Sequence, residues 1–144
     1  MRITVAIIGW LLTLALSIGI AGPLFGTCTQ GDDKPWISSV IFFAPIGLIG
    51  LALAAVGAKL GRWFCWLAIP HILTVALGCY LIPRYFIYTT LGGQNVCFVR
   101  EGSNADLSAS LLQRLWAPAW FIMLALLVWV IVSYWRGYNG DLRN

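Results

Sequence analysis

The 144-residue sequence is 60% hydrophobic and only 10% charged, with a mean hydropathy of +0.87 and a formal net charge of +4. Soluble domains carry about 25% charged residues, so this composition excludes an ordinary soluble protein and indicates a membrane protein. The nine Lys and Arg residues are scattered along the chain rather than clustered, so we expect a lipid bilayer and no nucleic acid as the chain's surroundings.

Four long apolar segments follow one another along the chain. A helix rises 1.5 Å per residue, so about 20 residues cover the roughly 30 Å hydrocarbon core. The predicted spans are residues 3–25, 36–58, 63–82 and 115–134, which leave two larger loops at 26–35 and 84–114. The expected fold is an all-α integral membrane protein, with residues 1–144 as a single domain built as an antiparallel bundle of four transmembrane helices.

The first apolar run has features of a signal peptide, because one basic residue, Arg2, precedes it and small residues follow it. The run of over 20 residues is longer than the apolar core of a usual signal peptide, so we interpret it as a retained first span.

The second and third spans are joined by a short connection, Gly57-Ala58-Lys59-Leu60-Gly61-Arg62. Spans joined this tightly are expected to be antiparallel neighbours. We therefore predict a helical hairpin from Pro35 to Pro83, around which the rest of the chain is arranged.

Small residues recur along the second span at spacings of three and four. They are Gly47, Gly50, Ala54, Gly57 and Gly61. Such a strip lets a neighbouring helix approach closely and gain van der Waals contact. We expect helix packing within the chain, against the third or the first span, and a dimer interface is the alternative.

The second larger loop contains two β-prone runs, Tyr85 to Leu91 and Gln94 to Val99, on either side of Gly92-Gly93. Strand-forming residues around a Gly-Gly turn predict a short β-hairpin on the membrane surface. The alternative is a helical extension of the third span through Thr90.

The basic residues predict the orientation of the chain. If the termini and the connection at 57–62 share one side, that side holds five basic residues and the other side four. They are Arg2, Lys59, Arg62, Arg136 and Arg143 against Lys34, Arg84, Arg100 and Arg114. Because basic residues near span ends favour the cytoplasmic side, we predict a plasma or inner membrane protein with both termini cytoplasmic and both larger loops extracytoplasmic.

This orientation places Cys28 and Cys97 in the two outer loops, where disulfides persist. A Cys28–Cys97 disulfide would brace the loops and close a segment of about 70 residues, which stabilises the fold by on the order of 4 kcal/mol. Cys79 is the competing partner for either cysteine. No Cys-x-x-Cys pair occurs, so we interpret the predicted bridge as structural rather than redox-active.

His71 lies near the middle of the predicted third span, after Pro70 and before Thr74. An ionisable residue at this depth is a functional hypothesis, as a haem ligand, a quinone hydrogen-bond partner or a proton relay. A haem with two axial ligands needs a second ligand besides His71, and only Met123 lies at a comparable depth. A proton relay needs a carboxylate, and no Asp or Glu lies in a predicted span. We favour a neutral structural histidine bonded to a neighbouring helix, and we expect no cofactor and no metal.

No Gly-x-Ser-x-Gly, His-Glu-x-x-His, P-loop or dinucleotide-binding motif occurs, so we do not expect an enzyme. The sequence favours a small non-catalytic membrane subunit that packs on a larger membrane protein complex and stabilises it or helps to assemble it. One alternative is a protein that binds a partner or toxin through its extracytoplasmic surface, as receptors and immunity proteins do, and depends on Tyr88 and Phe98. The other is a haem- or quinone-binding redox subunit that uses His71.

Overall fold

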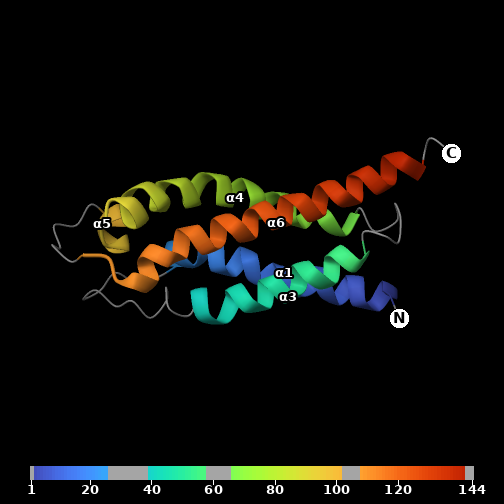
Figure 1. Cartoon of the computed structure of the whole chain (residues 1–144), viewed down its shortest axis with the longest axis horizontal. Coiled ribbons are helices and arrows are strands. Elements are labelled where there is room, and N and C mark those ends of the chain that lie inside the picture. Colours follow the sequence, from blue (N-terminus) through green and yellow to red (C-terminus); the bar gives the residue numbers. More distant parts are fainter. Residues whose placement is uncertain (1, 26–38, 58–65, 102–107, 142–144) are drawn as a thin grey trace.

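The computed structural model describes residues 2–25, 39–57, 66–101 and 108–141 (Figure 1). Its elements are α1 (Arg2–Phe25), the π-helical turn η2 (Ser39–Phe43), α3 (Ala44–Gly57), α4 (Pro70–Tyr85), the π-helical turn η5 (Phe86–Leu91), α5 (Val96–Glu101) and α6 (Leu111–Asp141). Within these residues the fold is all-helical, and the extended backbone pairs only in one isolated bridge between Gln94 and Ser108.

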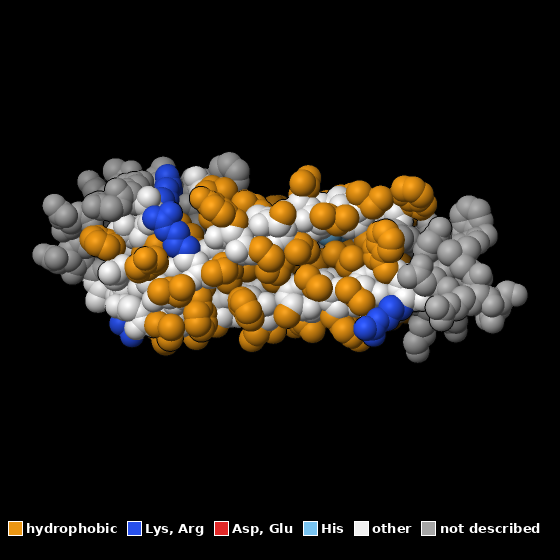
Figure 2. All heavy atoms as spheres, turned by 90° about the horizontal axis from the view of Figure 1, so that it is seen from above, with side chains coloured by type: hydrophobic (Ala, Val, Ile, Leu, Met, Phe, Trp, Pro, Cys, Tyr) orange, Lys and Arg blue, Asp and Glu red, His pale blue; other side chains and the backbone are white. Residues whose placement is uncertain are grey.

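Four helical stretches are long and apolar enough to cross a membrane: Ile3–Gly22, Ser39–Gly57, Trp66–Leu91 and Leu111–Arg136. They run side by side along the long axis of the molecule, with the start of α1 and the end of α6 at one end and α5 at the other (Figure 1). Hydrophobic side chains cover the middle of the molecule on the face shown in Figure 2, and its basic side chains lie towards the two ends. The composition and this surface are those of a four-helix membrane protein.

The four helices pack in the cyclic order α1, α3, α6, α4, with a further contact between α1 and α6. The predicted hairpin of the second and third spans is therefore wrong, because among the described residues α3 and α4 are not a packed pair. The eight residues between them, 58–65, lie outside the described ranges, as does the predicted turn. Eight residues can reach about 26 Å, well beyond the 8–10 Å between packed helix axes. A short connection therefore does not force contact, and the packing surfaces decide the neighbours.

The small-residue strip of α3 packs on α1. Gly50 allows backbone contact, since a Cβ atom added there would lie 2.6 Å from the Thr13 nitrogen. On the facing helix a Cβ added to Gly9 would lie 2.4 Å from the Ala54 nitrogen. Gly47, Ala54 and Gly57 are buried in the same bundle, and Gly61 lies outside the described residues. The strip is thus covered by a helix of the same chain, and the first span rather than the third is its partner.

Two hydroxyl groups satisfy carbonyls that proline leaves without a donor inside the apolar helices. Pro23 cannot donate to the carbonyl of Gly19, and Ser39 Oγ donates to that oxygen at 2.8 Å. Pro118 lies within α6, and Thr90 Oγ1 donates at 2.8 Å to the carbonyl four residues before it. Each hydroxyl replaces the donor that the proline lacks, so these side chains let the prolines sit inside spanning helices.

The predicted β-hairpin at 85–99 is wrong, and the alternative of a helical extension through Thr90 is confirmed. The third span continues through η5 to Leu91, a turn with Gly93 at φ 67° follows, and α5 begins at Val96. A helix satisfies its own backbone bonds, whereas a lone two-stranded hairpin leaves two edges unpaired, which is costly beside lipid. The predicted loop 84–114 is shortened further because α6 begins at Leu111.

Candidate functional site

His71 lies in the first turn of α4 rather than near the middle of the third span. That span runs from Trp66 to Leu91, longer at its C-terminal end than predicted, which places its middle near Gly78. Pro70 is at the start of α4 and has no N–H to donate to the carbonyl four residues earlier, that of Trp66. The Ile69 nitrogen donates to the Trp66 carbonyl at 3.2 Å, so this carbonyl still has a hydrogen-bond partner.

The imidazole of His71 is packed inside the bundle, with 2% of the residue exposed. Its ring centroid lies 4.7 Å from that of Trp10, which in turn lies 5.4 Å from the ring of Tyr134. Nδ1 of His71 has no hydrogen-bond partner among the described residues. An aromatic ring this close to the imidazole leaves little room for a haem or a quinone beside it.

The sequence's second haem-ligand candidate, Met123, is packed elsewhere. Its Cε would lie 3.2 Å from a Cβ added to Gly47, at the level of Leu16, which is about two turns along α1 from Trp10. In the described part of the chain, no group of three or more His, Cys, Asp or Glu residues is arranged to hold a metal ion. His71 and Met123 therefore lie at different levels of the bundle, and the expected role of His71 as a structural histidine stays a prediction.

The cysteines differ in their environment. Cys79 is a free thiol on the exposed side of α4. Cys97 is buried in α5 and is not a free thiol. Its predicted partner, Cys28, lies outside the described residues, so the Cys28–Cys97 disulfide stays a prediction.

The outer face of α4 carries a polar group at an unusual depth. Leu73, Tyr80 and Ile87 recur every seven residues on this face, and the first two are the most exposed, at 77% and 75%. Exposed Ala76 and Pro83 lie between them. Leu73, Ala76, Tyr80 and Pro83 belong to α4 and have the spacing of a helix-packing seam, and Ile87 follows in the π-helical turn η5. We call these five residues the α4 stripe.

Tyr80 lies close to the midpoint of the apolar spans by two measures. It is near the midpoint of the span Trp66–Leu91. The second measure comes from α6. Gly78, two residues before Tyr80, packs on Leu124, since a Cβ added to Gly78 would lie 2.9 Å from Leu124 Cδ2. Leu124 is near the midpoint of the span Leu111–Arg136. The Tyr80 backbone lies about 3 Å along the helix from this level, so in a bilayer centred there its hydroxyl would stay within the roughly 15 Å half-thickness of the hydrocarbon.

A hollow adjoins the α5-end portion of the stripe. It has a volume of about 280 Å³ and is lined by Pro83, Phe86, Ile87 and Phe121. The rings of Phe86 and Phe121 lie 6.4 Å apart across it. The hollow is purely apolar in its side chains, which suits an apolar side chain rather than a polar ligand.

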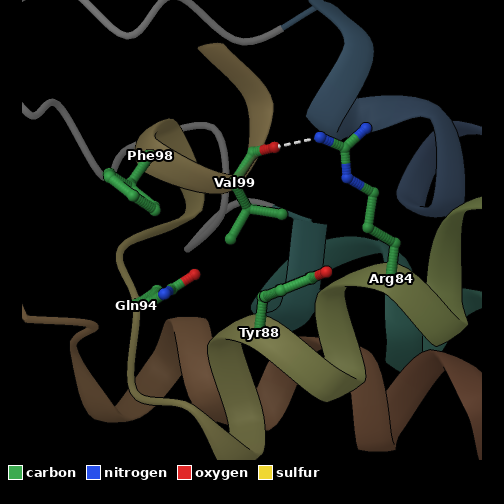
Figure 3. Close-up of a pocket in the computed structure, with 5 residues that line it drawn as sticks. All are labelled: Arg84, Tyr88, Gln94, Phe98 and Val99. Atoms are coloured by element: carbon green, nitrogen blue, oxygen red, sulfur yellow. Dashed lines mark hydrogen bonds between the residues drawn. The ribbon is translucent and has the colours of Figure 1, made fainter. Parts of the chain in front are cut away.

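A larger and more polar pocket lies at the α5 end of the bundle. It has a volume of about 470 Å³ and is lined by Arg84, Tyr88, Gln94, Phe98 and Val99 (Figure 3). Nη2 of Arg84 donates to the carbonyl of Val99 at 2.6 Å, which joins α4 to α5. The pocket combines a guanidinium group, a phenol and an amide with two apolar walls.

The short helix α5 is held in place by its own cap and by the bundle. Asn95 Oδ1 accepts a bond from the Cys97 nitrogen at 2.8 Å, which caps the start of the helix. The Val96 nitrogen donates to Oε1 of Gln113 on α6 at 3.3 Å, and Val96 itself is buried. The wall of the pocket that carries Phe98 and Val99 is therefore anchored to α6.

Sequence reasoning found some of these residues and missed others. Tyr88 and Phe98 were expected on facing strands, and the structure brings them together on one pocket across the predicted Gly-Gly turn. The roles of Arg84 and Tyr80 were missed. Tyr80 lies two residues from the end of the predicted span 63–82, so the sequence carried no signal of its central depth, and the approach of Arg84 to Val99 depends on how α5 folds back.

Comparison of the chain with protein-family models, with curated proteins and with solved structures gave no match.

Proposed function

We propose that the protein is a small non-catalytic integral membrane subunit that packs, through the α4 stripe, on a transmembrane helix of a larger membrane protein complex. In this role it stabilises the complex or helps to assemble it. The observation that carries the proposal is the exposed phenol of Tyr80 near mid-membrane.

A hydroxyl in hydrocarbon without a hydrogen-bond partner costs free energy, about 1–3 kcal/mol on protein scales. A helix that brings a hydrogen-bond acceptor to Tyr80 removes this cost, and interhelical hydrogen bonds together with packing drive association in membranes. The stripe supplies the packing surface, because its residues have the seven-residue recurrence of a seam.

The hollow beside the stripe favours a different protein over a second copy of this chain. In a symmetric dimer the same patch faces itself, so the hollow at Pro83 and Ile87 would be opposed by a hollow. A partner helix of another sequence can place an apolar side chain there. The proposed occupant is therefore a transmembrane helix with an acceptor near its middle and an apolar side chain about one to two turns towards the α5 end.

A matched pair of substitutions tests the proposal. Ala76 on the stripe and Ala52 on α3 are both exposed, so Ala76→Trp and Ala52→Trp make the same change on two different faces. The tagged variants are extracted from native membranes in mild detergent, and the proteins that migrate with them on a native gel are identified and quantified. We expect a stoichiometric membrane partner that is lost with Ala76→Trp and kept with Ala52→Trp. Tyr80→Phe, which removes only the hydroxyl, should weaken the association.

Three results would refute the α4 stripe as the docking face. They are the absence of a stoichiometric partner, a partner that is retained equally by both tryptophan variants, and a homodimer that Ala76→Trp disrupts. Co-purification alone does not support the proposal, because only the difference between the two faces does.

We also propose the orientation and the bridge expected from the sequence. The start of α1 and the end of α6 share one end of the bundle, which supports placing both termini on the same side (Figure 1). The distribution of basic residues in the sequence favours the cytoplasm for that side. The α5 end, where Cys97 is buried, would then be extracytoplasmic, where a disulfide to Cys28 would persist. Non-reducing peptide mapping of the purified protein tests the bridge, and a free Cys28 would exclude it.

The pocket at the α5 end favours a second candidate function, which is binding at the extracytoplasmic surface. The predicted dependence on Tyr88 and Phe98 is supported by their position in its lining. The two functions are compatible, because the α4 stripe and the described lining of the pocket have no residue in common.

A further inference from the structure

The described residues that line the pocket at the α5 end offer hydrogen-bond donors to a ligand, and none of these five residues is acidic. Arg84 carries five N–H donors, of which Nη2 donates to Val99. The Tyr88 phenol and the Gln94 amide add donors on neighbouring walls.

Three arginines of the described residues, Arg84, Arg100 and Arg114, lie at this end of the bundle. The guanidinium groups of Arg84 and Arg100 both lie close enough to the Tyr85 phenol to interact with it electrostatically. Arg114 lies on the same end of the bundle, where its Nη2 would be 2.7 Å from a Cβ added to Gly93. Planar guanidinium groups recognise phosphate through paired hydrogen bonds.

The pocket opens at the depth of the lipid headgroups. Tyr88 comes ten residues after Gly78, the residue near mid-membrane, and ten helical residues rise about 15 Å. This is about half the thickness of the hydrocarbon core, so Tyr88 lies at its boundary. Arg84 is one turn deeper, and its long side chain extends outwards to Val99 on α5, as arginines do near the ends of spans. Phe98 provides an apolar wall for the part of a ligand that enters the lipid.

We propose that this pocket binds a phosphate-bearing anion, with Arg84 as the group that contacts the phosphate and Tyr88 and Gln94 as supporting donors. The phosphate belongs either to the headgroup of an anionic phospholipid or to a soluble phosphate monoester. The site is independent of the α4 stripe, so either proposal can fail without the other.

Native mass spectrometry of the purified protein tests the site. The protein in detergent is titrated with phosphatidylglycerol, with phosphatidylcholine as the zwitterionic comparison, and in a separate arm with glycerol phosphate. We expect saturable binding of phosphatidylglycerol, and Arg84→Gln should weaken it by about tenfold or more, the loss of one charge-assisted contact. Arg136→Gln removes a basic residue at the opposite end of the bundle and should leave binding unchanged.

A second variant keeps the test valid if Arg84→Gln disturbs the fold through its bond to Val99. Gln94 pairs with Ser108 through its backbone, so Gln94→Glu changes only the side chain that lines the pocket. The added carboxylate should repel the anion or pair with Arg84, and phosphatidylglycerol binding should again fall about tenfold. Melting curves of both variants confirm that the fold is kept.

The two arms separate the sources of the phosphate. Competition by glycerol phosphate at millimolar concentration supports a soluble ligand, and binding of phosphatidylglycerol without such competition supports a lipid. The proposal is overturned if Arg84→Gln, Gln94→Glu and Arg136→Gln all bind like the unmodified chain, or if phosphatidylcholine binds as tightly as phosphatidylglycerol and glycerol phosphate does not bind.

Discussion

Replacing Gly50 by alanine is expected to destabilise the bundle, although alanine is the better helix former. The new Cβ atom would lie 2.6 Å from the Thr13 nitrogen, 2.8 Å from the Leu12 carbonyl carbon and 3.0 Å from the Gly9 oxygen. All three are backbone atoms of α1, so no side chain can rotate away. Ordinary contact begins at 3.4 Å, and the first distance falls short of it by 0.8 Å, so α1 and α3 must separate.

The magnitude follows from two opposing terms. Overpacking of a close interface costs about 1–3 kcal/mol, and alanine gains up to about 1 kcal/mol of helix propensity over glycine. The expected net loss for Gly50→Ala is about 1–2 kcal/mol. In Gly47→Ala the nearest atoms are side-chain atoms, Leu16 Cγ at 3.1 Å and Met123 Cε at 3.2 Å, which can move, so its loss should be smaller.

Gly22→Ala is the matched control on α1. A Cβ atom there lies 3.6 Å from Ser39 Oγ, which is ordinary contact, so this variant should be as stable as the unmodified chain or more stable. Unfolding in mixed micelles with increasing sodium dodecyl sulfate, followed by the fluorescence of the eight tryptophans, gives the differences. If Gly50→Ala unfolds at the same detergent fraction as Gly22→Ala, the close backbone contact between α1 and α3 is refuted.

Three further predictions follow from single side chains. Ser39→Ala should cost about 1–2 kcal/mol of stability, because the Gly19 carbonyl of α1, which Pro23 leaves without a donor, loses its partner. Ser133→Ala is the control, because its hydroxyl donates to the Trp129 carbonyl within a regular turn of the same helix. It should cost under about 0.5 kcal/mol in the same unfolding assay. Tyr134→Phe should cost about 0.5–1.5 kcal/mol, since the phenol donates at 2.7 Å to the Ala54 carbonyl, and an unchanged midpoint would exclude that bond. Cys79 should react with a lipid-soluble maleimide in the isolated protein, as judged against Cys79→Ser by mass spectrometry, and protection in detergent would contradict its exposed position.

Much of the fold is predictable from the sequence because each span is an apolar segment of sufficient length. The four spans follow from hydropathy, and the strip of Gly47, Gly50 and Gly57 was identified from spacing alone. The spacing of small residues marks a packing face without naming its partner. The choice of α1 over α4 depends on which backbone is complementary, and Gly9 on α1 provides the matching close approach.

The candidate sites were less predictable, for two physical reasons. The β-prone residues from Tyr85 to Leu91 form a helical continuation because a helix at this depth satisfies its own backbone, which outweighs local strand preference. The depth of a residue also depends on where its span ends. The extension to Leu91 moves His71 towards one end and leaves Tyr80 near the middle.

The sequence by itself determined that this chain has four apolar segments long enough to cross a membrane as helices, because hydropathy and length are properties of each segment alone. Only the tertiary structure decided that α3 packs on α1 and not on α4, that Trp10 covers His71, and that Arg84 meets Val99 at the mouth of a pocket. These features join residues far apart in the chain, and lipid-facing and protein-facing surfaces are equally apolar in the sequence. Their separation therefore depends on which helix faces fit one another.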